Sequence, residues 1–168
     1  FASGMSNGAM FVHRLGCELA DRVAAIAAVS GTDMTASCSP ARAVPVMHTH
    51  GTADAHVPWN GGGGCGPSAA SFTSVPTTIA RWRSRDACTD TSSTPGYAAG
   101  EGHCESWGGC GAGSEVVLCT IDGGGHSWPG GDPPADVTPC PGDGVQSSTF
   151  HASEVAWSFF RTHPMPTP

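Results

Sequence analysis

The sequence contains no lysine, so its seven basic residues are all Arg, and 14 Asp and Glu leave a formal net charge of −7. Proteins that bind nucleic acid through its phosphates need a basic face. The nearest basic run consists of Arg81, Arg83 and Arg85, mixed with Trp82 and followed by Asp86. This pattern is typical of a solvated helix face. We therefore expect no nucleic-acid partner.

Long apolar runs are also missing from the sequence. No stretch approaches the ~20 consecutive apolar residues that a membrane helix needs, so we expect no membrane partner. The 168 residues are 39% hydrophobic, which excludes wholesale disorder and allows one domain with a packed core over 1–168.

Cysteine is abundant by contrast. The chain has eight Cys and no CxxC pair of the kind that binds zinc. An even, high count in a short chain favours disulfides in an exported protein, so the sequence predicts a secreted, extracellular or periplasmic location. The chain begins FASGMSNG, without an initiator Met or a signal peptide, and we expect it to be the C-terminal portion of a longer protein.

Apolar runs and helix signals alternate along the chain. Continuous apolar runs of four to eight residues are typical of strands buried on both faces of a mostly parallel sheet. The sequence predicts a strand end at 1–3, a tight turn at 4–8, strands at 23–30, 44–50 and 115–122, and helices at 9–20, 75–87 and 149–162. The polar segment 89–113 is expected to be a loop with at most a short hairpin. Alternating strands and helices predict an α/β sandwich.

The segment Gly4 to Gly8 fits G-x-S-x-G, the nucleophile elbow. Its glycines allow a strained turn between a strand and a helix, which lifts the Ser6 hydroxyl clear of the sheet. The backbone N–H of Asn7 then lies beside the serine and is a candidate oxyanion donor. The second oxyanion donor of this kind of site comes from a loop before the elbow, which this sequence does not contain.

A serine nucleophile needs a histidine base that a carboxylate orients, and α/β-hydrolases carry them in the chain order Ser, acid, His. Asp54 follows the apolar run 44–50, and His126 follows the run 115–122. Both positions lie just after predicted strands, where α/β folds place their sites. Asp122 is the rival acid, although it precedes His126 by only four residues.

Three segments, GMSNGAM, HGTADAHVPWNGG and GGGHSWPGG, carry a family resemblance. The sequence resembles the secreted esterases related to poly(3-hydroxybutyrate) depolymerases and to feruloyl or acetylxylan esterases. The resemblance implies an α/β-hydrolase-type three-layer sandwich, from the nucleophile elbow onward. It also implies Ser6 as nucleophile, His126 as base and Asp54 as acid, with no metal and no organic cofactor. The substrate is then an ester, either a polyester or a plant cell-wall ester.

Aromatic residues follow two of the proposed triad members. Trp59 and Trp128 come shortly after Asp54 and His126, so both are candidates for binding substrate, and Met5 beside the nucleophile is a third. The alternative that the two Trp only pack loops stays open. The remaining Trp residues are interpreted as packing residues, and four His as surface residues: Trp82, Trp107 and Trp157, and His13, His103, His151 and His163.

Two disulfides are expected from the positions of the cysteines. Cys65 and Cys140 lie in the loops that follow Asp54 and His126, so a bridge between them would join these loops. Cys17 and Cys38 flank the predicted strand 23–30 and form the second expected pair. The other four cysteines are expected to pair with one another around 88–119. Sequence alone does not choose among their pairings.

Two alternatives to a serine esterase remain open. His48, His50 and His56 have the spacing of a metal site on a strand and its loop, which would make the protein a metal-dependent hydrolase. The other alternative is an inactive truncated hydrolase that needs a missing N-terminal segment or a partner. Such a fragment would expose a sheet edge and self-associate.

Overall fold

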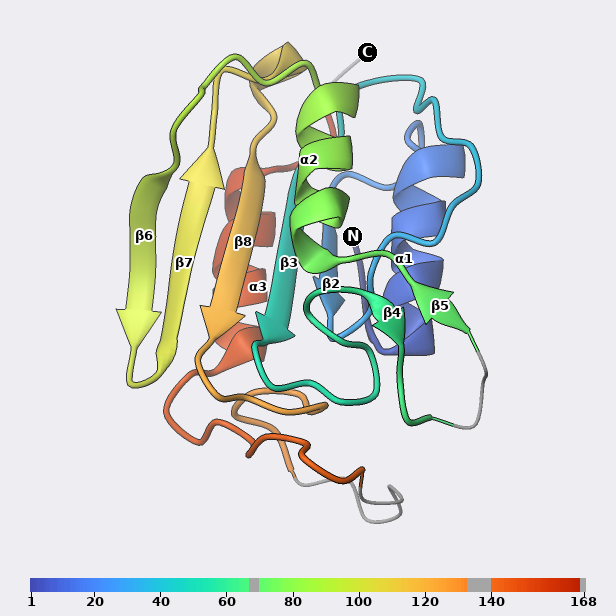
Figure 1. Ribbon diagram of the computed structural model, residues 1–168. Helices are drawn as coiled ribbons and strands as arrows, with labels where there is room; N and C mark the ends of the chain where they lie inside the picture. Colours follow the sequence, from blue (N-terminus) through green and yellow to red (C-terminus); the bar gives the residue numbers. More distant parts are fainter. Residues whose placement is uncertain (67–69, 133–139, 167–168) are drawn as a thin grey trace.

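The computed structural model describes residues 1–66, 70–132 and 140–166 (Figure 1). Six strands form one mixed sheet in the order β1-β2-β3-β8-β7-β6. These strands are β1 (Ala2–Met5), β2 (Ile26–Val29), β3 (Val46–Gly51), β6 (Thr94–Ala99), β7 (Gly102–Trp107) and β8 (Val116–Ile121). A separate pair is formed by β4 (Gly62–Gly63) and β5 (Ser71–Phe72), and the helices are α1 (Asn7–Glu18), α2 (Val75–Arg85), the short 3-10 helix Gly111–Gly113 and α3 (Ala152–Thr162).

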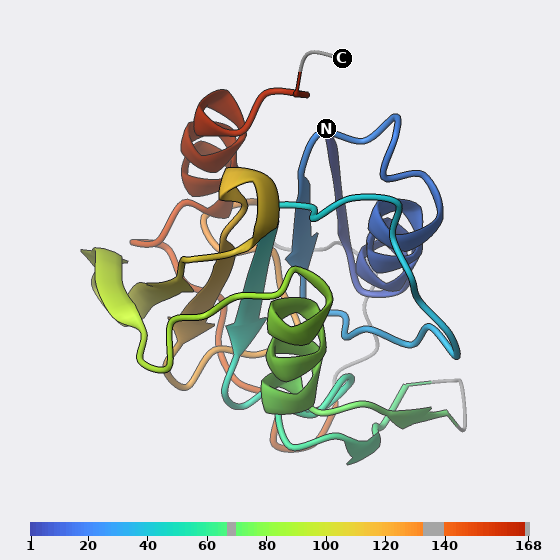
Figure 2. The same ribbon diagram turned by 90° about the horizontal axis from the view of Figure 1, so that it is seen from above.

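Helices cover both faces of the large sheet, so the fold has three layers (Figures 1 and 2). Alternate residues of a strand point to opposite faces. Val46 of β3 packs in one apolar cluster with residues of α1 and α2, whereas Met47 packs in a second cluster with Phe159 of α3. In Figure 1, α2 lies in front of the sheet and α3 behind it. The predicted α/β class is confirmed.

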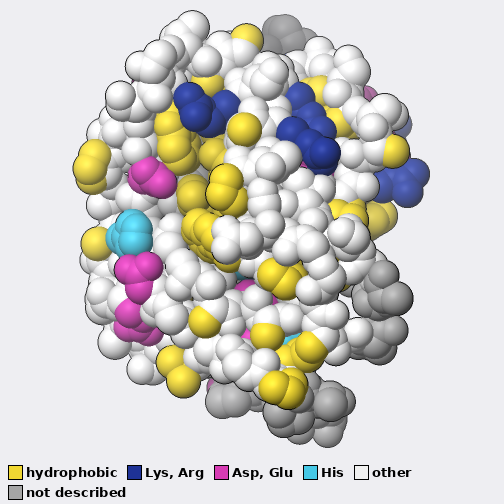
Figure 3. Space-filling model, viewed as in Figure 1, with side chains coloured by type: hydrophobic (Ala, Val, Ile, Leu, Met, Phe, Trp, Pro, Cys, Tyr) yellow, Lys and Arg dark blue, Asp and Glu magenta, His cyan; other side chains and the backbone are white. Residues whose placement is uncertain are grey.

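Four neighbouring strands, β1, β2, β3 and β8, run parallel to one another. Their carboxyl ends meet at one edge of the sheet, which is the lower edge in Figure 1. The segments that follow β1, β3 and β8 carry the three predicted triad residues. On the face seen in Figure 3, the Arg side chains lie in the upper half, away from this edge.

The segment 89–113 is more regular than its composition suggested. It contains β6 and β7, which form an antiparallel hairpin that extends the sheet beyond β8. The hairpin that the sequence suggested is therefore present, but the prediction that the segment is mostly a loop was wrong. The sequence of β6 lacks the apolar pattern of a buried strand. This edge strand is almost entirely exposed and includes Pro95 and Gly96.

Two further expectations about side chains were wrong. His13 was interpreted as a surface residue, yet it is fully buried on the sheet-facing side of α1. Trp157 was interpreted as a packing residue, yet 58% of its surface is exposed on α3. Both errors arise because the helical face that meets the sheet is decided by how the helix packs on it. The α1 helix begins at Asn7 and not at residue 9.

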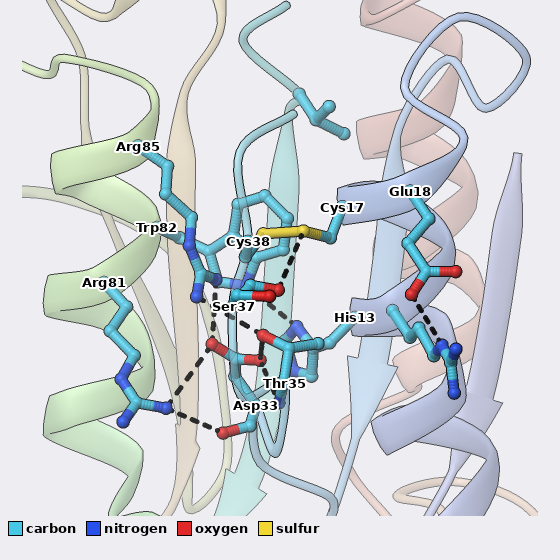
Figure 4. The surroundings of a disulfide bond; sticks show 12 residues. His13, Cys17, Glu18, Asp33, Thr35, Ser37, Cys38, Arg81, Trp82 and Arg85 are labelled. Atoms are coloured by element: carbon cyan, nitrogen blue, oxygen red, sulfur yellow. Dashed lines mark hydrogen bonds and ion pairs between the residues drawn. A yellow bond between two sulfur atoms is a disulfide. The ribbon is translucent and has the colours of Figure 1, made fainter. Parts of the chain in front are cut away.

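Four disulfides join all eight cysteines. The structure pairs Cys17 with Cys38 (Figure 4) and Cys65 with Cys140, which are the two pairs expected from the sequence. The other two bridges are Cys88–Cys110 and Cys104–Cys119. Within the described ranges, no helix is both long enough and apolar enough to cross a membrane.

Candidate active site

Ser6 occupies a strained turn between β1 and α1. Its backbone has φ 56° and ψ −122°, a conformation that non-glycine residues rarely adopt. Such strain persists only where the surroundings impose it, and it is concentrated at functional sites. The Ser6 N–H donates to the Val29 carbonyl of β2 at 2.9 Å, which fixes the turn at the carboxyl edge of the sheet.

Two glycines permit the close packing around this turn. A Cβ at Gly4 would lie 2.7 Å from the carbonyl carbon and oxygen of Gly8, and a Cβ at Gly31 would overlap the Ser6 carbonyl oxygen. A Cβ at Gly8 would meet nothing within 4 Å. The first glycine of the G-x-S-x-G motif is therefore sterically required, whereas the second is not.

Asp54 lies in the turn after β3 and is 4% exposed. Its Oδ1 accepts hydrogen bonds from the backbone N–H groups of His56 at 2.9 Å and Val57 at 2.8 Å. Its Oδ2 lies 2.9 Å from His126 Nδ1 and 3.3 Å from His50 Nε2. Burial raises the pKa of Asp54, but the hydrogen bonds from His126 and His50 outweigh it and hold that pKa well below its usual range. The carboxylate is therefore ionised and fixed in orientation.

His126 lies in the loop after β8 and is 9% exposed. Its ring is held on two sides, by the Asp54 carboxylate at Nδ1 and by the ring of His56, which stacks on it with 4.6 Å between centroids. Its backbone N–H donates to Asp143 Oδ1 at 3.1 Å, and the same oxygen accepts from Ala55 N–H at 2.9 Å. Asp143 thus ties the loop of Asp54 to the loop of His126.

Neither His56 nor Asp143 could be predicted from the sequence as a partner of the base. Their roles depend on loop contacts between segments far apart in the chain. The glycines before His126 are the one trace of these contacts in the sequence. A Cβ at Gly125 would overlap the carbonyl oxygen of Gly144, so glycine is needed where the two loops meet. A run of glycines before a candidate base can therefore indicate that another loop approaches closely.

Ser6 lies at the same edge of the sheet as the Asp54–His126 pair. The two are connected through the turn after β2, where Gly31 contacts the Ser6 carbonyl and Ser30 Oγ donates to the Ser127 carbonyl at 3.3 Å. Among the described residues, no hydrogen bond joins the Ser6 hydroxyl to His126. Catalytic hydrogen bonds of free enzymes are often long and tighten when substrate binds.

The other predicted site residues have the following surroundings. Asn7 is the first residue of α1, so its N–H has no partner within the helix. Trp59 is half-buried beside the His50 ring, and Trp128 Nε1 donates to Ser153 Oγ at 3.0 Å, so both pack against the protein. Met5 is the last residue of β1 and is half-buried. Substrate contact by these three side chains stays a prediction.

Asp122, the rival acid, does not contact His126 in the structure. It lies beside His103 Nδ1 at 3.6 Å, and 65% of its side chain is exposed. The geometry therefore favours Asp54 as the acid that orients the imidazole.

The proposed metal ligands His48, His50 and His56 are not brought together in the described part of the chain. His48 and His50 hydrogen-bond to each other in the core, whereas His56 lies against His126. The alternative metal site was therefore wrong, because the strand turns two of its ligands inward. A different group, Asp54, His56 and His126, has its ligand atoms within 4.8 Å of one another.

The fold and the site together define the structural class of the protein. This is a three-layer α/β protein with a strained serine at a strand–helix turn and a buried Asp–His pair at the same sheet edge. No family model matches the chain. It is 34% identical over 137 residues to feruloyl esterase B of Piromyces equi, and 25% identical over 131 residues to a bifunctional acetylxylan esterase/xylanase of Neocallimastix patriciarum. Each match covers 76% of this chain, but only 24% and 18% of these relatives.

Proposed function

We propose that this chain carries the catalytic residues of a serine carboxylic-ester hydrolase. The observation that carries the proposal is the buried 2.9 Å contact between Asp54 Oδ2 and His126 Nδ1, at the sheet edge that also holds the strained Ser6. The similarity to two proteins named as esterases supports the same activity. In this proposal the chain uses neither a metal nor an organic cofactor.

The reaction proceeds in two steps. His126 Nε2 takes the proton of the Ser6 hydroxyl as its oxygen attacks the ester carbonyl, and the imidazolium then protonates the departing alkoxide. Water, deprotonated by the same nitrogen, attacks the acyl-serine, and the imidazolium returns the proton to the Ser6 oxygen as the acid leaves. Asp54 keeps the Nδ1–H tautomer of His126 and stabilises the imidazolium in both steps. The Asn7 N–H donates to the oxyanion, and the loop that supplies a second donor in folds of this kind precedes the nucleophile elbow.

Aromatic or acetyl esters of plant cell walls are the favoured substrate class. The relatives' names, feruloyl esterase and acetylxylan esterase/xylanase, support this class. A polyester such as poly(3-hydroxybutyrate) is the alternative. Parallel assays on methyl ferulate, acetylated xylan and poly(3-hydroxybutyrate) distinguish them, and release of ferulate or acetate with no soluble product from the polyester is the expected result.

The activity is tested with p-nitrophenyl acetate. The Ser6→Ala variant is expected to lose about 10⁴-fold or more in kcat/KM. The Ser71→Ala variant alters an exposed serine of β5 and is expected to hydrolyse the ester at the rate of the unaltered chain. An activity that survives Ser6→Ala would sink the proposal.

The state of the chain is tested at the same time. A stoichiometric burst of p-nitrophenol from a monodisperse monomer supports the enzyme, whereas no burst from a self-associated chain supports the alternative of an incomplete hydrolase. β1 and β6 are the two outermost strands of the large sheet, and association would occur at an edge of this kind. The four disulfides support the proposed secreted location.

A further inference from the structure

Three histidines form a continuous hydrogen-bond chain through the core. Trp82 Nε1 donates to His13 Nδ1 at 2.9 Å (Figure 4), and His13 Nε2 lies 3.3 Å from His48 Nδ1. His48 Nε2 lies 3.0 Å from His50 Nδ1, and His50 Nε2 lies 2.8 Å from the Val57 carbonyl oxygen. We call His13, His48 and His50 the histidine chain.

The histidine chain crosses the interior from α2 through α1 to β3. Trp82 belongs to α2 and His13 to α1, and the other two histidines lie two residues apart on β3, so they share the face that α1 and α2 cover. The three imidazoles are at most 1% exposed. All six of their ring nitrogens have a partner within 3.3 Å.

The two ends of the chain fix the position of every ring proton. The indole N–H of Trp82 can only donate, so His13 Nδ1 accepts and His13 carries its proton on Nε2. The Val57 carbonyl can only accept, so His50 also carries its proton on Nε2. His48 must then accept at Nδ1 and donate at Nε2, because any other arrangement sets two protons or two lone pairs against each other. All three rings are neutral Nε2–H tautomers, and all the hydrogen bonds point the same way.

The surroundings of His13 and His48 agree with neutral imidazoles. Burial lowers the pKa of His13 to about 4, although the nearby Asp33 opposes this shift. Burial, followed by the neighbouring imidazoles, lowers the pKa of His48 well below its usual range. The other charged group that faces His13 is Arg85, which pairs with Asp33 at 2.8 Å.

The last proton of the histidine chain, which His50 Nε2 donates to the Val57 carbonyl, lies beside the site. His50 Nε2 lies 3.3 Å from Asp54 Oδ2, the same oxygen that contacts His126 Nδ1. A buried polar network is costly unless every member is satisfied, and apolar side chains of similar size would fill this space without that cost. The direction of the histidine chain places its terminal N–H, on His50 Nε2, beside the Asp54 carboxylate as well as the Val57 carbonyl.

We propose that the histidine chain positions Asp54, with His50 as the positioning residue that holds Oδ2 in line with His126 and helps to keep it ionised. This inference rests on the proposed esterase function, because Asp54 is the acid of the proposed triad. His50 is then the second imidazole beside Asp54 Oδ2, after His126. His50 acts through Asp54 and touches no reacting atom. The role requires a neutral His50 with its proton on Nε2.

The first test does not depend on activity. In the full chain labelled with ¹⁵N-histidine, two-bond ¹H–¹⁵N NMR spectra at pH 7 distinguish the two neutral tautomers from the cation. The expected result is three Nε2–H tautomers for His13, His48 and His50. A cation or an Nδ1–H tautomer at any of the three overturns the proposal.

The second test compares His50→Leu with His50→Gln on p-nitrophenyl acetate. His50→Leu removes the donor, so we expect kcat to fall about 10- to 100-fold with KM unchanged. The acid limb of the kcat/KM profile is expected to move to higher pH, because a carboxylate without this donor attracts the His126 proton more strongly. The groups that face His50 in this titration are His48 and Asp54. His50→Gln keeps an N–H donor at a similar reach and is expected to recover most of the rate.

A matched control separates this role from general packing. His163 is also largely buried but lies at the end of α3, against Glu115, and His163→Leu is expected to leave kcat and the pH profile unchanged. Equal losses in His50→Leu and His50→Gln, or an unchanged His50→Leu, overturn the proposal. Ester hydrolysis that survives Ser6→Ala instead refutes the proposed function, and the NMR result then decides the histidine chain alone.

Discussion

The imidazole of His56 lies against that of His126, with 4.6 Å between ring centroids and 25° between ring planes. The stack restricts rotation about the side-chain bonds of His126. We expect His56→Ala to lower kcat on p-nitrophenyl acetate about tenfold, because the base is then less well oriented. His56→Phe keeps a ring on this face and should retain most of the rate. Equal rates for the two variants would show that stacking has no part in orienting the base.

Asp54 and Asp122 are the two acids that the sequence offered as partners of the base, and a pair of matched variants separates them. Asp54→Asn removes the charge and favours the wrong His126 tautomer, so kcat is expected to fall about 10⁴-fold. Asp122→Asn alters an exposed residue beside His103 and should change kcat less than twofold. Steady-state kinetics at pH 7 measure both. A larger loss in Asp122→Asn than in Asp54→Asn would contradict the assignment of the acid.

Gly4 and Gly8 occupy equivalent places in the motif but unequal places in the structure. Gly4→Ala sets a Cβ 2.7 Å from backbone atoms of Gly8, so we expect a lower melting temperature and loss of the acyl-enzyme burst. Gly8→Ala adds a Cβ in open space within α1 and should raise the free energy of unfolding by about 0.5–1 kcal/mol. Thermal unfolding of both variants tests the contrast, and a destabilised Gly8→Ala would refute it.

Asp86 makes stability depend on pH. Burial raises its pKa from 3.8 to about 6, against the hydrogen bonds from Val44 N–H and Ser114 Oγ. Because its pKa is higher in the folded state, its contribution to stability is fully present below about pH 4 and is lost as the pH rises through 6. The loss amounts to about 3 kcal/mol at pH 7.

Urea unfolding from pH 4 to pH 7 measures this contribution. Asp86→Asn cannot ionise, so its free energy of unfolding should rise relative to that of the unaltered chain as the pH increases. Asp21→Asn, whose side chain is 66% exposed, is the control and should follow the unaltered chain. Parallel curves for Asp86→Asn and the unaltered chain would rule out an elevated pKa.

Local patterns were enough to locate the parallel strands and the proposed triad. The runs 44–50 and 115–122 correspond to β3 and β8, whose residues are all buried, so their apolar composition follows directly from their place in the sheet. The strained turn at Ser6 could be expected because G-x-S-x-G is contiguous in sequence. These features depend on interactions within one short segment or on burial alone.

Contacts between distant segments could not be read from the sequence. The pair His48 and His50 was visible as two polar residues within an apolar strand, and it suggested metal ligands. Their actual partner, His13, lies on α1, and Trp82, which donates to His13, lies on α2. Which rings meet is decided by how α1 and α2 pack on the sheet, and a single sequence does not contain that information.

The position of β8 between β3 and β7 bears on how the protein is made. A ribosome delivers the chain from its N-terminal end, so Ser6 emerges well before His126 and Asp143. Strand β3 gains its second neighbour only when β8 arrives, and the turn that holds Asp54 is completed by contacts with the loops that follow β8. The proposed nucleophile is therefore made well before the surroundings of its proposed base and acid are complete.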